Sequence, residues 1–311
     1  MKTDVVIVGG GLCGLILARI LTEAGLSAKV FDKASRPGGR LATRKTSDET
    51  VDTGPQSLCF DSPEALAAVQ RYAPGELAPI SGDGSYSYGF RTSSAALSGA
   101  LRQGVDYRTG LVTHLARKSD DTFTPALWGH PASFDADAVA LTPPAPQVVN
   151  LLRASHLEVP RWLSRIDYEK RLVLVSEAIT SDQPKGGSSK VFEYWGNTQP
   201  GSQSWVAFAS AEWSENHWGQ DQIATESEML REVVRLFPER RTSTAQVKRW
   251  RYANAIDPEE SMRSYRLSGL PIWIAGDGYG APTSPAFGAQ RSVLSAISTA
   301  ESILTSLQTD R

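Results

Sequence analysis

An α/β fold built around a parallel sheet is predicted by three features that lie close together in the chain. The apolar strand VVIV, Val5 to Val8, runs directly into glycines at positions 9, 11 and 14. An apolar helical segment covers residues 12–25, and the strand AKVFD then ends on Asp32. A strand, a glycine turn, a helix and a strand ending in an acid together form the dinucleotide-binding βαβ unit of Rossmann-like domains.

The glycines of this turn have separate physical roles. Gly9 makes the tight turn out of the strand, Gly11 lets a pyrophosphate approach bare backbone, and Gly14 lets the helix pack against the sheet. The start of that helix favours a diphosphate because its N–H groups are unsatisfied and its dipole end is positive. Asp32 is placed to accept hydrogen bonds from ribose hydroxyls. The turn therefore predicts a dinucleotide cofactor.

The segment RPGGR, which ends at Arg40, indicates which dinucleotide binds. It resembles the GG-containing segment that follows the ribose-binding acid in amine oxidases and related flavoproteins, and VDTGP, with Asp52 and Gly54, resembles the strand that returns after it. The resemblance implies FAD, with Gly38 and Gly39 allowing close backbone approach and Arg40 donating to phosphate. It also implies a Rossmann-like FAD-binding domain of the glutathione-reductase or amine-oxidase type, with an inserted mixed-sheet substrate domain.

The remaining elements continue the α/β pattern. Helical spacing predicts short helices at residues 63–72 and 93–101, and alternation predicts a strand at 105–115. Residues 135–152 predict a strand, a proline stop and a helix. Val, Phe, Tyr and Trp recur between residues 168 and 213 and predict a second sheet, and residues 224–239 then predict an amphipathic helix.

The C-terminal region predicts a strand, LPIWI, that runs into Gly276 and Asp277, followed by a helix. The flavoprotein resemblance places Asp277 on a ribityl hydroxyl of FAD, and it places the start of the helix, with Ala286 and Phe287, against the pyrimidine side of the flavin. A positive helix end there stabilises the reduced cofactor. The same resemblance puts the backbone of Val112 beside adenine.

The expected cofactor residues are Gly9, Gly11, Leu12, Cys13, Gly14, Asp32, Lys33, Gly39, Arg40, Val112, Gly276, Asp277, Ala286 and Phe287. The FAD-binding domain is expected to comprise residues 1–60, 90–150 and 265–311. Residues 61–89 and 151–264 are expected to form the substrate domain.

Two tryptophan-containing segments narrow the resemblance to renalase-like flavoproteins. SWVAFASAEWSENHW, residues 204–218, is similar to their W-V-x-x-A-S-x-x-W-S segment, and KRWRYA, residues 248–253, is similar to their H-R-W-x-Y-A. The resemblance implies oxidation of the 2- and 6-dihydro isomers of NAD(P)H, with hydride passing to flavin N5 and then dioxygen giving hydrogen peroxide and NAD(P)+. No catalytic side chain is assigned, because the reaction mainly requires the substrate ring to be held against the flavin.

The expected substrate-side residues are Tyr194, Trp195, Trp205, Trp213, His217, Lys248, Arg249 and Trp250. The chain departs from the renalase-like pattern where Lys248 replaces His, where Ser57, Leu58 and Cys59 replace aromatic and threonine residues, and where Ser284 replaces an acid. These departures concern the substrate more than the cofactor. Two alternatives therefore stay open: an amine oxidase or desaturase with another small substrate, and a non-catalytic, flavin-bound regulatory protein.

Composition limits the partners. The chain has 311 residues and a formal net charge of −2, which gives no general attraction to nucleic acid or anionic lipid. A small molecule and dioxygen are the expected partners. The sequence contains no uninterrupted apolar window of about 18 residues, so no membrane span is expected. Cys13 and Cys59 are too few for a disulfide framework or a zinc site, so no metal and a cytoplasmic location are expected. Because no cysteine follows Cys59, FAD is expected to be non-covalent.

Overall fold

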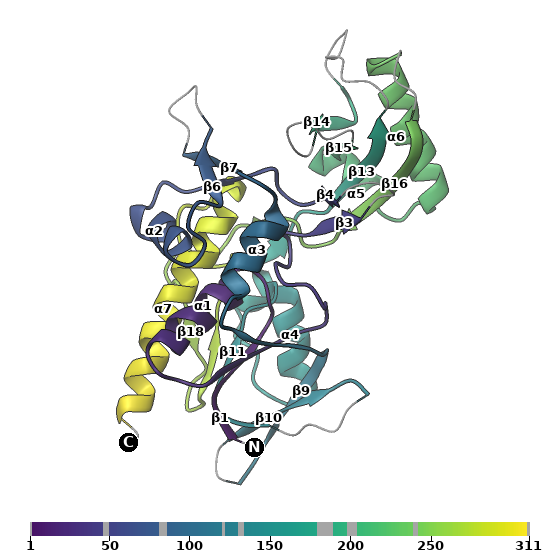
Figure 1. Cartoon of the computed structure of the whole chain (residues 1–311). Helices are drawn as coiled ribbons and strands as arrows, with labels where there is room; N and C mark the ends of the chain where they lie inside the picture. Colours follow the sequence, from purple (N-terminus) through teal and green to yellow (C-terminus); the bar gives the residue numbers. More distant parts are fainter. Residues whose placement is uncertain are drawn as a thin grey trace. The chain divides into compact units, whose positions relative to one another are not determined.

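The computed structural model describes residues 2–45, 50–80, 86–119, 122–129, 134–178, 189–197, 204–238 and 242–309. These residues form two compact units, shown in Figure 1. Unit 1 comprises residues 1–41, 57–167 and 255–311, and unit 2 comprises residues 42–56 and 168–254.

A sheet with the strand order β18-β19-β11-β1-β2-β8 forms the centre of unit 1 (Figure 1). Its strands are β1 (Lys2–Val8), β2 (Ala28–Asp32), β8 (Asp106–Thr109), β11 (Asp135–Leu141), β18 (Tyr265–Arg266) and β19 (Ile272–Ile274). The pairs β1–β2, β1–β11, β11–β19 and β2–β8 are parallel, and β18 is antiparallel to β19. Strands β9 (Val112–Arg117) and β10 (Phe123–Leu127) extend the sheet through an antiparallel pairing with β11. The predicted Rossmann-like α/β fold is confirmed.

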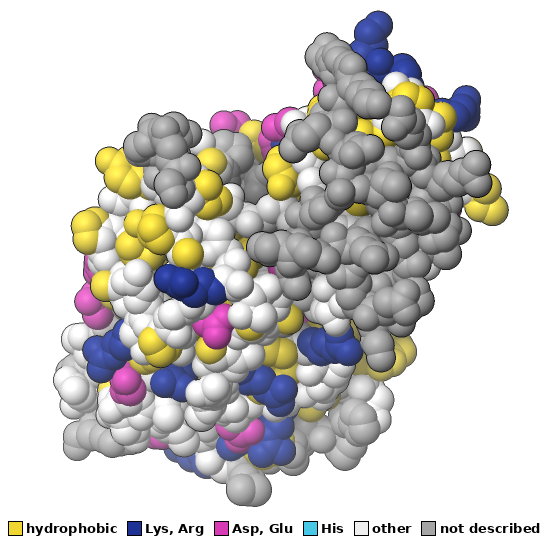
Figure 2. Space-filling model, turned by 45° about the horizontal axis from the view of Figure 1, so that its top comes forward, with side chains coloured by type: hydrophobic (Ala, Val, Ile, Leu, Met, Phe, Trp, Pro, Cys, Tyr) yellow, Lys and Arg dark blue, Asp and Glu magenta, His cyan; other side chains and the backbone are white. Residues whose placement is uncertain are grey.

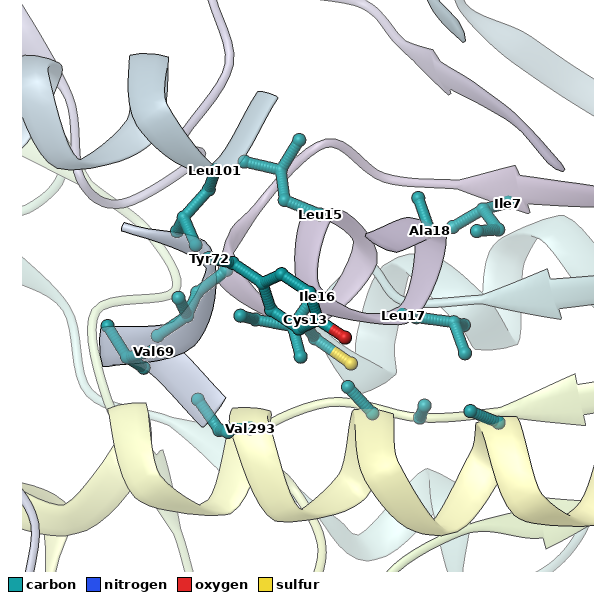
Figure 3. Close-up of a cluster of buried hydrophobic side chains, with 14 of the residues drawn as sticks. Ile7, Cys13, Leu15, Ile16, Leu17, Ala18, Val69, Tyr72, Leu101 and Val293 are labelled. Carbon is teal, nitrogen blue, oxygen red and sulfur yellow. The ribbon is translucent and has the colours of Figure 1, made fainter. Parts of the chain in front are cut away.

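Helices pack against the parallel sheet and against one another. The helices of unit 1 are α1 (Leu12–Glu23), α2 (Pro63–Tyr72), α3 (Ser94–Arg102), α4 (Ala145–Ala154) and α7 (Gly288–Thr309), with the 3-10 turns η1 (Leu163–Arg165) and η2 (Pro285–Phe287). The first part of α1 is buried on all sides, since every residue from Leu12 to Ala18 is buried. Figure 3 shows α1 between its neighbours, with Leu15, Ile16 and Leu17 fully buried and Val293 of α7 beside them. The hydroxyls of Ser62 and Ser93 cap α2 and α3 by accepting from backbone N–H groups.

A small antiparallel sheet completes unit 1. It has the order β5-β7-β6, with β5 (Ser57–Cys59), β6 (Leu77–Pro79) and β7 (Ser87–Phe90). Leu58 and Leu77 of this sheet join the same buried cluster as α1, α2 and α7. The short strands β12 (Asp167–Tyr168) and β17 (Ala255–Ile256) occur where the chain passes from one unit to the other.

Unit 2 is a four-stranded antiparallel sheet, counted over its described residues, with the order β14-β15-β13-β16. Its elements are β13 (Arg171–Ala178), β14 (Phe192–Asn197), β15 (Ser204–Ala209), β16 (Thr242–Trp250), the ribbon β3 (Thr43–Lys45) and β4 (Thr50–Asp52), α5 (Ala211–Asn216) and α6 (Gln222–Leu236). Asp221 caps α6 by accepting from Ile223 N–H at 2.9 Å. The predicted apolar face of this helix, Met229, Val233 and Leu236, is buried in the core of the unit.

The two units divide the chain differently from the expected domains. Residues 61–89 fall in unit 1 because α2 and the β5-β7-β6 sheet pack into its core, whereas residues 42–56 fall in unit 2 because Val51 packs against Val173 and Val206. The expected strand at 105–115 is two strands, β8 and β9, and between them Gly110 N–H donates to the Asp32 carbonyl at 2.7 Å. Residues 81–85 and 181–188, where the small and polar residues of SGDGS and SDQPKGGS predict loops, lie outside the described residues.

Two further features bear on partners. Among the described residues, no helix combines the length and the apolar character needed to cross a membrane. On the face shown in Figure 2, dark blue Lys and Arg side chains lie interspersed with magenta Asp and Glu side chains.

Candidate functional site

The candidate site lies at the carboxyl ends of the parallel strands of unit 1. Gly9 follows β1, Asp32 ends β2, Thr142 follows β11 and Gly276 follows β19 two residues after its end. The chain order of the strands reverses between β1 and β11, and ligands of open α/β sheets bind at such a switch point. Thr142 Oγ1 joins the two strands here by donating to the carbonyls of Val8 and Gly9 at 2.9 and 3.1 Å.

The glycine turn has the geometry that a diphosphate requires. Gly9 has a φ of +107°, and a Cβ added there would lie 2.5 Å from Thr142 Oγ1. A Cβ on Gly14 would lie 2.0 Å from the Gly9 carbonyl oxygen, so only glycine lets α1 approach the turn. Gly11 is the N-cap of α1 and has no side chain to accept from the first N–H groups of the helix, and no acidic residue lies in the first turn. A Cβ added to Gly11 would have no atom within 4 Å, so the space beside it is open. These residues fit an anionic cofactor group.

Asp32 is held against the turn through its carboxylate. Its Oδ2 accepts from Gly10 N–H at 2.6 Å and its Oδ1 accepts from Ala34 N–H at 2.8 Å. A Cβ on Gly10 would meet the Tyr107 ring at 2.4 Å, and the Tyr107 hydroxyl donates to the carbonyls of Ala34 and Arg36. Gly10 and Tyr107 were not expected from the sequence, because their role depends on β8 lying beside β2.

The RPGGR segment packs directly against the glycine turn. Gly38 N–H donates to the Gly10 carbonyl at 2.8 Å, and Gly38 forms a parallel bridge with Gly11. Gly39 has a φ of +57°, and a Cβ there would lie 3.2 Å from Gly11 Cα. Gly39 is therefore required by the close approach of two backbone segments, whereas a Cβ on Gly38 would lie 2.4 Å from Ser98 Oγ and 2.7 Å from the Leu41 carbonyl oxygen. The structure brings the two sequence motifs together at one place.

Arg40 and Asp277, expected as separate cofactor ligands, form an ion pair with each other. Arg40 Nη1 and Nη2 donate to Asp277 Oδ2 and Oδ1 at 2.6 and 2.7 Å. The Asp277 side chain is 3% exposed and that of Arg40 is 30% exposed. Burial raises the pKa of the neighbouring Cys13 thiol well above its usual range, and the Asp277 charge adds to that effect. Cys13 is accordingly a neutral packing residue in Figure 3.

Arg291, which was not expected from the sequence, organises the segment that follows β19. Arg291 is 1% exposed, and its guanidinium donates to the carbonyls of Asp277, Pro282 and Ser284 at 2.7, 2.7 and 2.8 Å. Its sequence signal is weak, because a single basic residue between Gln290 and Ser292 near the start of a helix is typical of a surface position. Gly276 N–H, next to this segment, donates to Ser295 Oγ at 2.9 Å.

The other expected cofactor residues lie around this centre. Leu12 is buried in α1 and Lys33 is exposed after β2. Val112 is buried at the start of β9, two residues after Gly110. Ala286 is exposed and Phe287 is half-buried in η2, immediately before α7. Among the described residues, no group of three or more His, Cys, Asp and Glu side chains is arranged to hold a metal.

Several expected substrate-side residues belong instead to the core of unit 2. Trp205 is 2% exposed and packs edge-on against Phe192 and Phe237, so it cannot contact a ligand without opening the core; this corrects its assignment. Trp195 packs edge-on against Phe237. Trp213 stacks on His217 with ring centroids 3.8 Å apart.

Lys248 and Trp250 lie on the opposite face of the unit 2 sheet from that core. The strand register aligns Tyr194, Phe208, Val173 and Lys248 in one row across β14, β15, β13 and β16. Lys248 Nζ lies 5.1 Å from the Trp250 ring centroid, and Trp250 Nε1 donates to the Thr53 carbonyl at 2.9 Å. We call Tyr194, Phe208, Lys248 and Trp250 the Lys248 face.

Arg249 points away from the Lys248 face. Successive strand residues alternate in direction, and the Arg249 guanidinium donates to the carbonyls of Trp218 and Gln220. It therefore fixes a loop of unit 2, which corrects its expected place among the substrate-side residues.

Comparison with known proteins agrees with this geometry. A family model described as an NAD(P)-binding Rossmann-like domain matches residues 7–72. Putrescine oxidase of Kocuria rosea is 28% identical over 151 residues, which cover 45% of this chain and 30% of the relative. Flavin-containing amine oxidase B of Mus musculus is 43% identical over 54 residues, which cover 17% of this chain and 10% of the relative. In these sequence matches the chain thus spans less than a third of the length of each relative.

Two solved structures share the fold. Putrescine oxidase bound to putrescine superposes with a TM-score of 0.70 at 15% identity, covering 98% of this chain and 99% of the other. A putative protoporphyrinogen oxidase from Exiguobacterium superposes with a TM-score of 0.67 at 15% identity, covering 97% and 98%. The chain therefore shares the fold of these two structures, and its residues 7–72 match a Rossmann-like domain.

Proposed function

We propose that this protein is an FAD-dependent oxidase and that unit 1 holds FAD non-covalently. The observation that carries the proposal is the cradle formed by Gly9, Gly11 and Gly14, with RPGGR packed against it. The start of α1 would receive the diphosphate, and Asp32 would accept from the adenosine ribose. The likeness to proteins named as flavin-containing amine oxidases supports the choice of FAD.

The Arg40–Asp277 pair completes the proposed cofactor site. Arg40 is partly exposed, and a guanidinium carries five N–H donors, so donation to phosphate is compatible with its two bonds to Asp277. Bound FAD would supply the redox chemistry, taking hydride from substrate and passing electrons to dioxygen to give hydrogen peroxide. The residues of unit 1 bind and orient the cofactor, and no side chain is required to move a proton.

For the substrate we propose the 2- and 6-dihydro isomers of NAD(P)H, which are oxidised to NAD(P)+. The Lys248 face supports this choice because it joins a cation to flat apolar rings. A nicotinamide dinucleotide has a planar ring and an anionic diphosphate, which match rings and an ammonium respectively. Among the described carboxylates, none forms an ion pair with Lys248 in the structure. The expected cytoplasmic location stays a prediction.

A flavin amine oxidase is the second candidate. The names of the relatives support it, since putrescine oxidase and amine oxidase B both refer to amines. Lys248 argues against a diamine at the same face, because two ammonium groups repel each other. The two candidates therefore predict opposite responses to the charge at position 248.

Anaerobic reduction separates the candidates. The oxidised flavin band of the purified protein is followed while borohydride-generated dihydro-NAD isomers, ordinary NADPH or putrescine are added. We expect bleaching by the isomers alone and recovery in air. Bleaching by putrescine alone would establish the second candidate, and a band that no substrate bleaches would indicate a non-catalytic flavoprotein. A protein purified and reconstituted without any flavin band would overturn the FAD assignment.

Replacing Lys248 tests the substrate face. We expect Lys248→Gln to raise KM for the dihydro isomers about tenfold, because a charge-assisted hydrogen bond contributes about 1.5 kcal/mol. Lys190→Gln is the matched control, since Lys190 is an exposed lysine of the same unit. An unchanged KM in Lys248→Gln would remove the Lys248 face from substrate recognition while leaving the FAD site intact.

A further inference from the structure

We propose that Arg291 is a positioning residue for the cofactor: with Arg40, it fixes Asp277 and the segment from Asp277 to Ser284, and so sets the affinity and reduction potential of FAD. The inference rests on the proposed FAD site. It concerns a side chain that no sequence motif selected.

Arg291 hydrogen-bonds to several carbonyls of one segment and holds them together; we call this arrangement the Arg291 clamp. One guanidinium donates to three carbonyl oxygens, at positions 277, 282 and 284 of the same segment. Because the donors of a guanidinium form a rigid planar fork, they fix these carbonyls relative to one another. A lysine has a single rotatable ammonium and cannot hold all three in the same plane. The clamp therefore requires arginine, not merely a positive charge.

The place of Arg291 in its helix makes the arrangement unusual. Arg291 lies in the first turn of α7, where the helix dipole favours anions over cations. A Cβ on Gly288 would lie 3.8 Å from Arg291 Nη2 and 3.9 Å from Asp277 Oδ2, so both charged groups surround the helix start. A buried cation at the unfavourable end of a helix breaks a local rule, and such violations concentrate at functional sites.

The charges of the cluster also point to the cofactor. Arg40 and Arg291 are positive and Asp277 is negative, so the three groups together carry one net positive charge. This charge lies in the buried part of the candidate site, where solvent screens it less than at the surface. It stabilises a bound anionic diphosphate. It also stabilises the reduced cofactor more than the oxidised cofactor.

Two variants separate the clamp from the charge. Arg291→Met removes both, and Arg291→Lys keeps the charge but loses the fork. We expect Arg291→Met to bind FAD at least tenfold more weakly. We also expect its equilibrium between reduced and oxidised FAD to shift about tenfold toward oxidised FAD, which lowers the reduction potential by about 30 mV for a two-electron couple. Arg291→Lys should restore most of the potential and little of the affinity. Arg263→Met is the control, because Arg263 of unit 1 is 52% exposed and pairs with Glu64 at the surface.

The outcomes distinguish this inference from the FAD assignment. If the wild-type protein binds FAD and both Arg291 variants retain its affinity and potential, the positioning role is wrong and the proposed function stands. If Arg291→Met does not fold, Arg291→Lys carries the same test. If the wild type binds no FAD, the proposed function fails, and hydrogen exchange of residues 277–284 in the protein itself tests the clamp: unchanged protection in Arg291→Lys would overturn it.

Discussion

The carboxylate of Asp277 is the most deeply buried member of an ion pair in unit 1, judged over the described residues. Its two oxygens accept from the two terminal nitrogens of Arg40, a geometry that fixes direction as well as charge. By contrast, the Arg263–Glu64 pair is about half exposed on both sides and contributes little to stability. The two pairs allow a comparison of buried and exposed charges in one unit.

Removing either partner of the buried pair is expected to damage both folding and cofactor retention. Arg40→Ala should lower the free energy of unfolding by about 3 kcal/mol, because the buried Asp277 carboxylate loses this partner, and Asp277→Ala should lower it by less, because Arg40 is partly exposed. Each should also weaken FAD retention. The double variant should lose less than the sum of the two single losses. Thermal melting and FAD titration measure both effects, with Arg263→Ala as the control, and full FAD retention in both single variants would contradict the assignment.

Tyr107 predicts a specific dependence of stability on alkaline pH. Burial raises the pKa of its phenol from 10.0 to about 12, and the nearby Asp32 charge adds to this. The folded state therefore holds the proton more tightly than the unfolded state. The stability from this group is complete below pH 10 and is lost as the pH rises to about 12.

The variant Tyr107→Phe tests this dependence. It should reduce the free energy of unfolding by about 1 kcal/mol at neutral pH, because the hydrogen bonds to Ala34 and Arg36 disappear. Its stability should then fall less steeply than that of the wild type above pH 10. Denaturant unfolding across the pH range measures both effects. Tyr86→Phe is the matched control because Tyr86 is 57% exposed, and parallel pH profiles for wild type and Tyr107→Phe would refute the linkage.

At the scale of elements, the β1–α1 connection depends on the absence of a side chain at Gly14. The added Cβ of Gly14→Ala would lie 2.0 Å from the Gly9 carbonyl oxygen, which is backbone and cannot rotate away. We expect a loss of at least 2 kcal/mol in stability and loss of FAD retention. Gly99→Ala is the control: Gly99 lies in α3, no atom lies within 4 Å of its added Cβ, and alanine there should be neutral or stabilising. Equal stabilities of the two variants would exclude a steric role for Gly14.

The elements show why some features were predictable and others were not. The β1–α1–β2 unit was predictable because the glycine spacing and Asp32 each have one structural use. The division of residues 105–115 into β8 and β9 was not, because alternation continues across Gly110 and only the pairing with Asp32 reveals the break. Trp205 resembled a binding residue because aromatic residues serve both cores and sites. Its burial became apparent only when Phe192 and Phe237 were placed beside it.

At the scale of the whole molecule, local sequence patterns could not predict which two segments of the chain form unit 2. Residues 42–56 follow the RPGGR segment directly and so were assigned with it, yet Val51 packs with Val173, Val175 and Val206. No local signal connects such distant segments. The same limit applies to Arg291, because its partners at positions 277–284 became evident only from the folded loop. Long-range packing, rather than residue type, determined these features.

The two-segment construction of unit 2 has a consequence for synthesis on the ribosome. Trp250 Nε1 donates to the Thr53 carbonyl across 197 residues of chain. The β3–β4 ribbon therefore emerges well before β13 and β15, and Val51 lacks its packing partners Val173 and Val206 during that interval. Most of unit 1 lies between the two segments in the chain order. The nascent protein must consequently keep its first apolar ribbon without its partner strands until β13 and β15 have been synthesised.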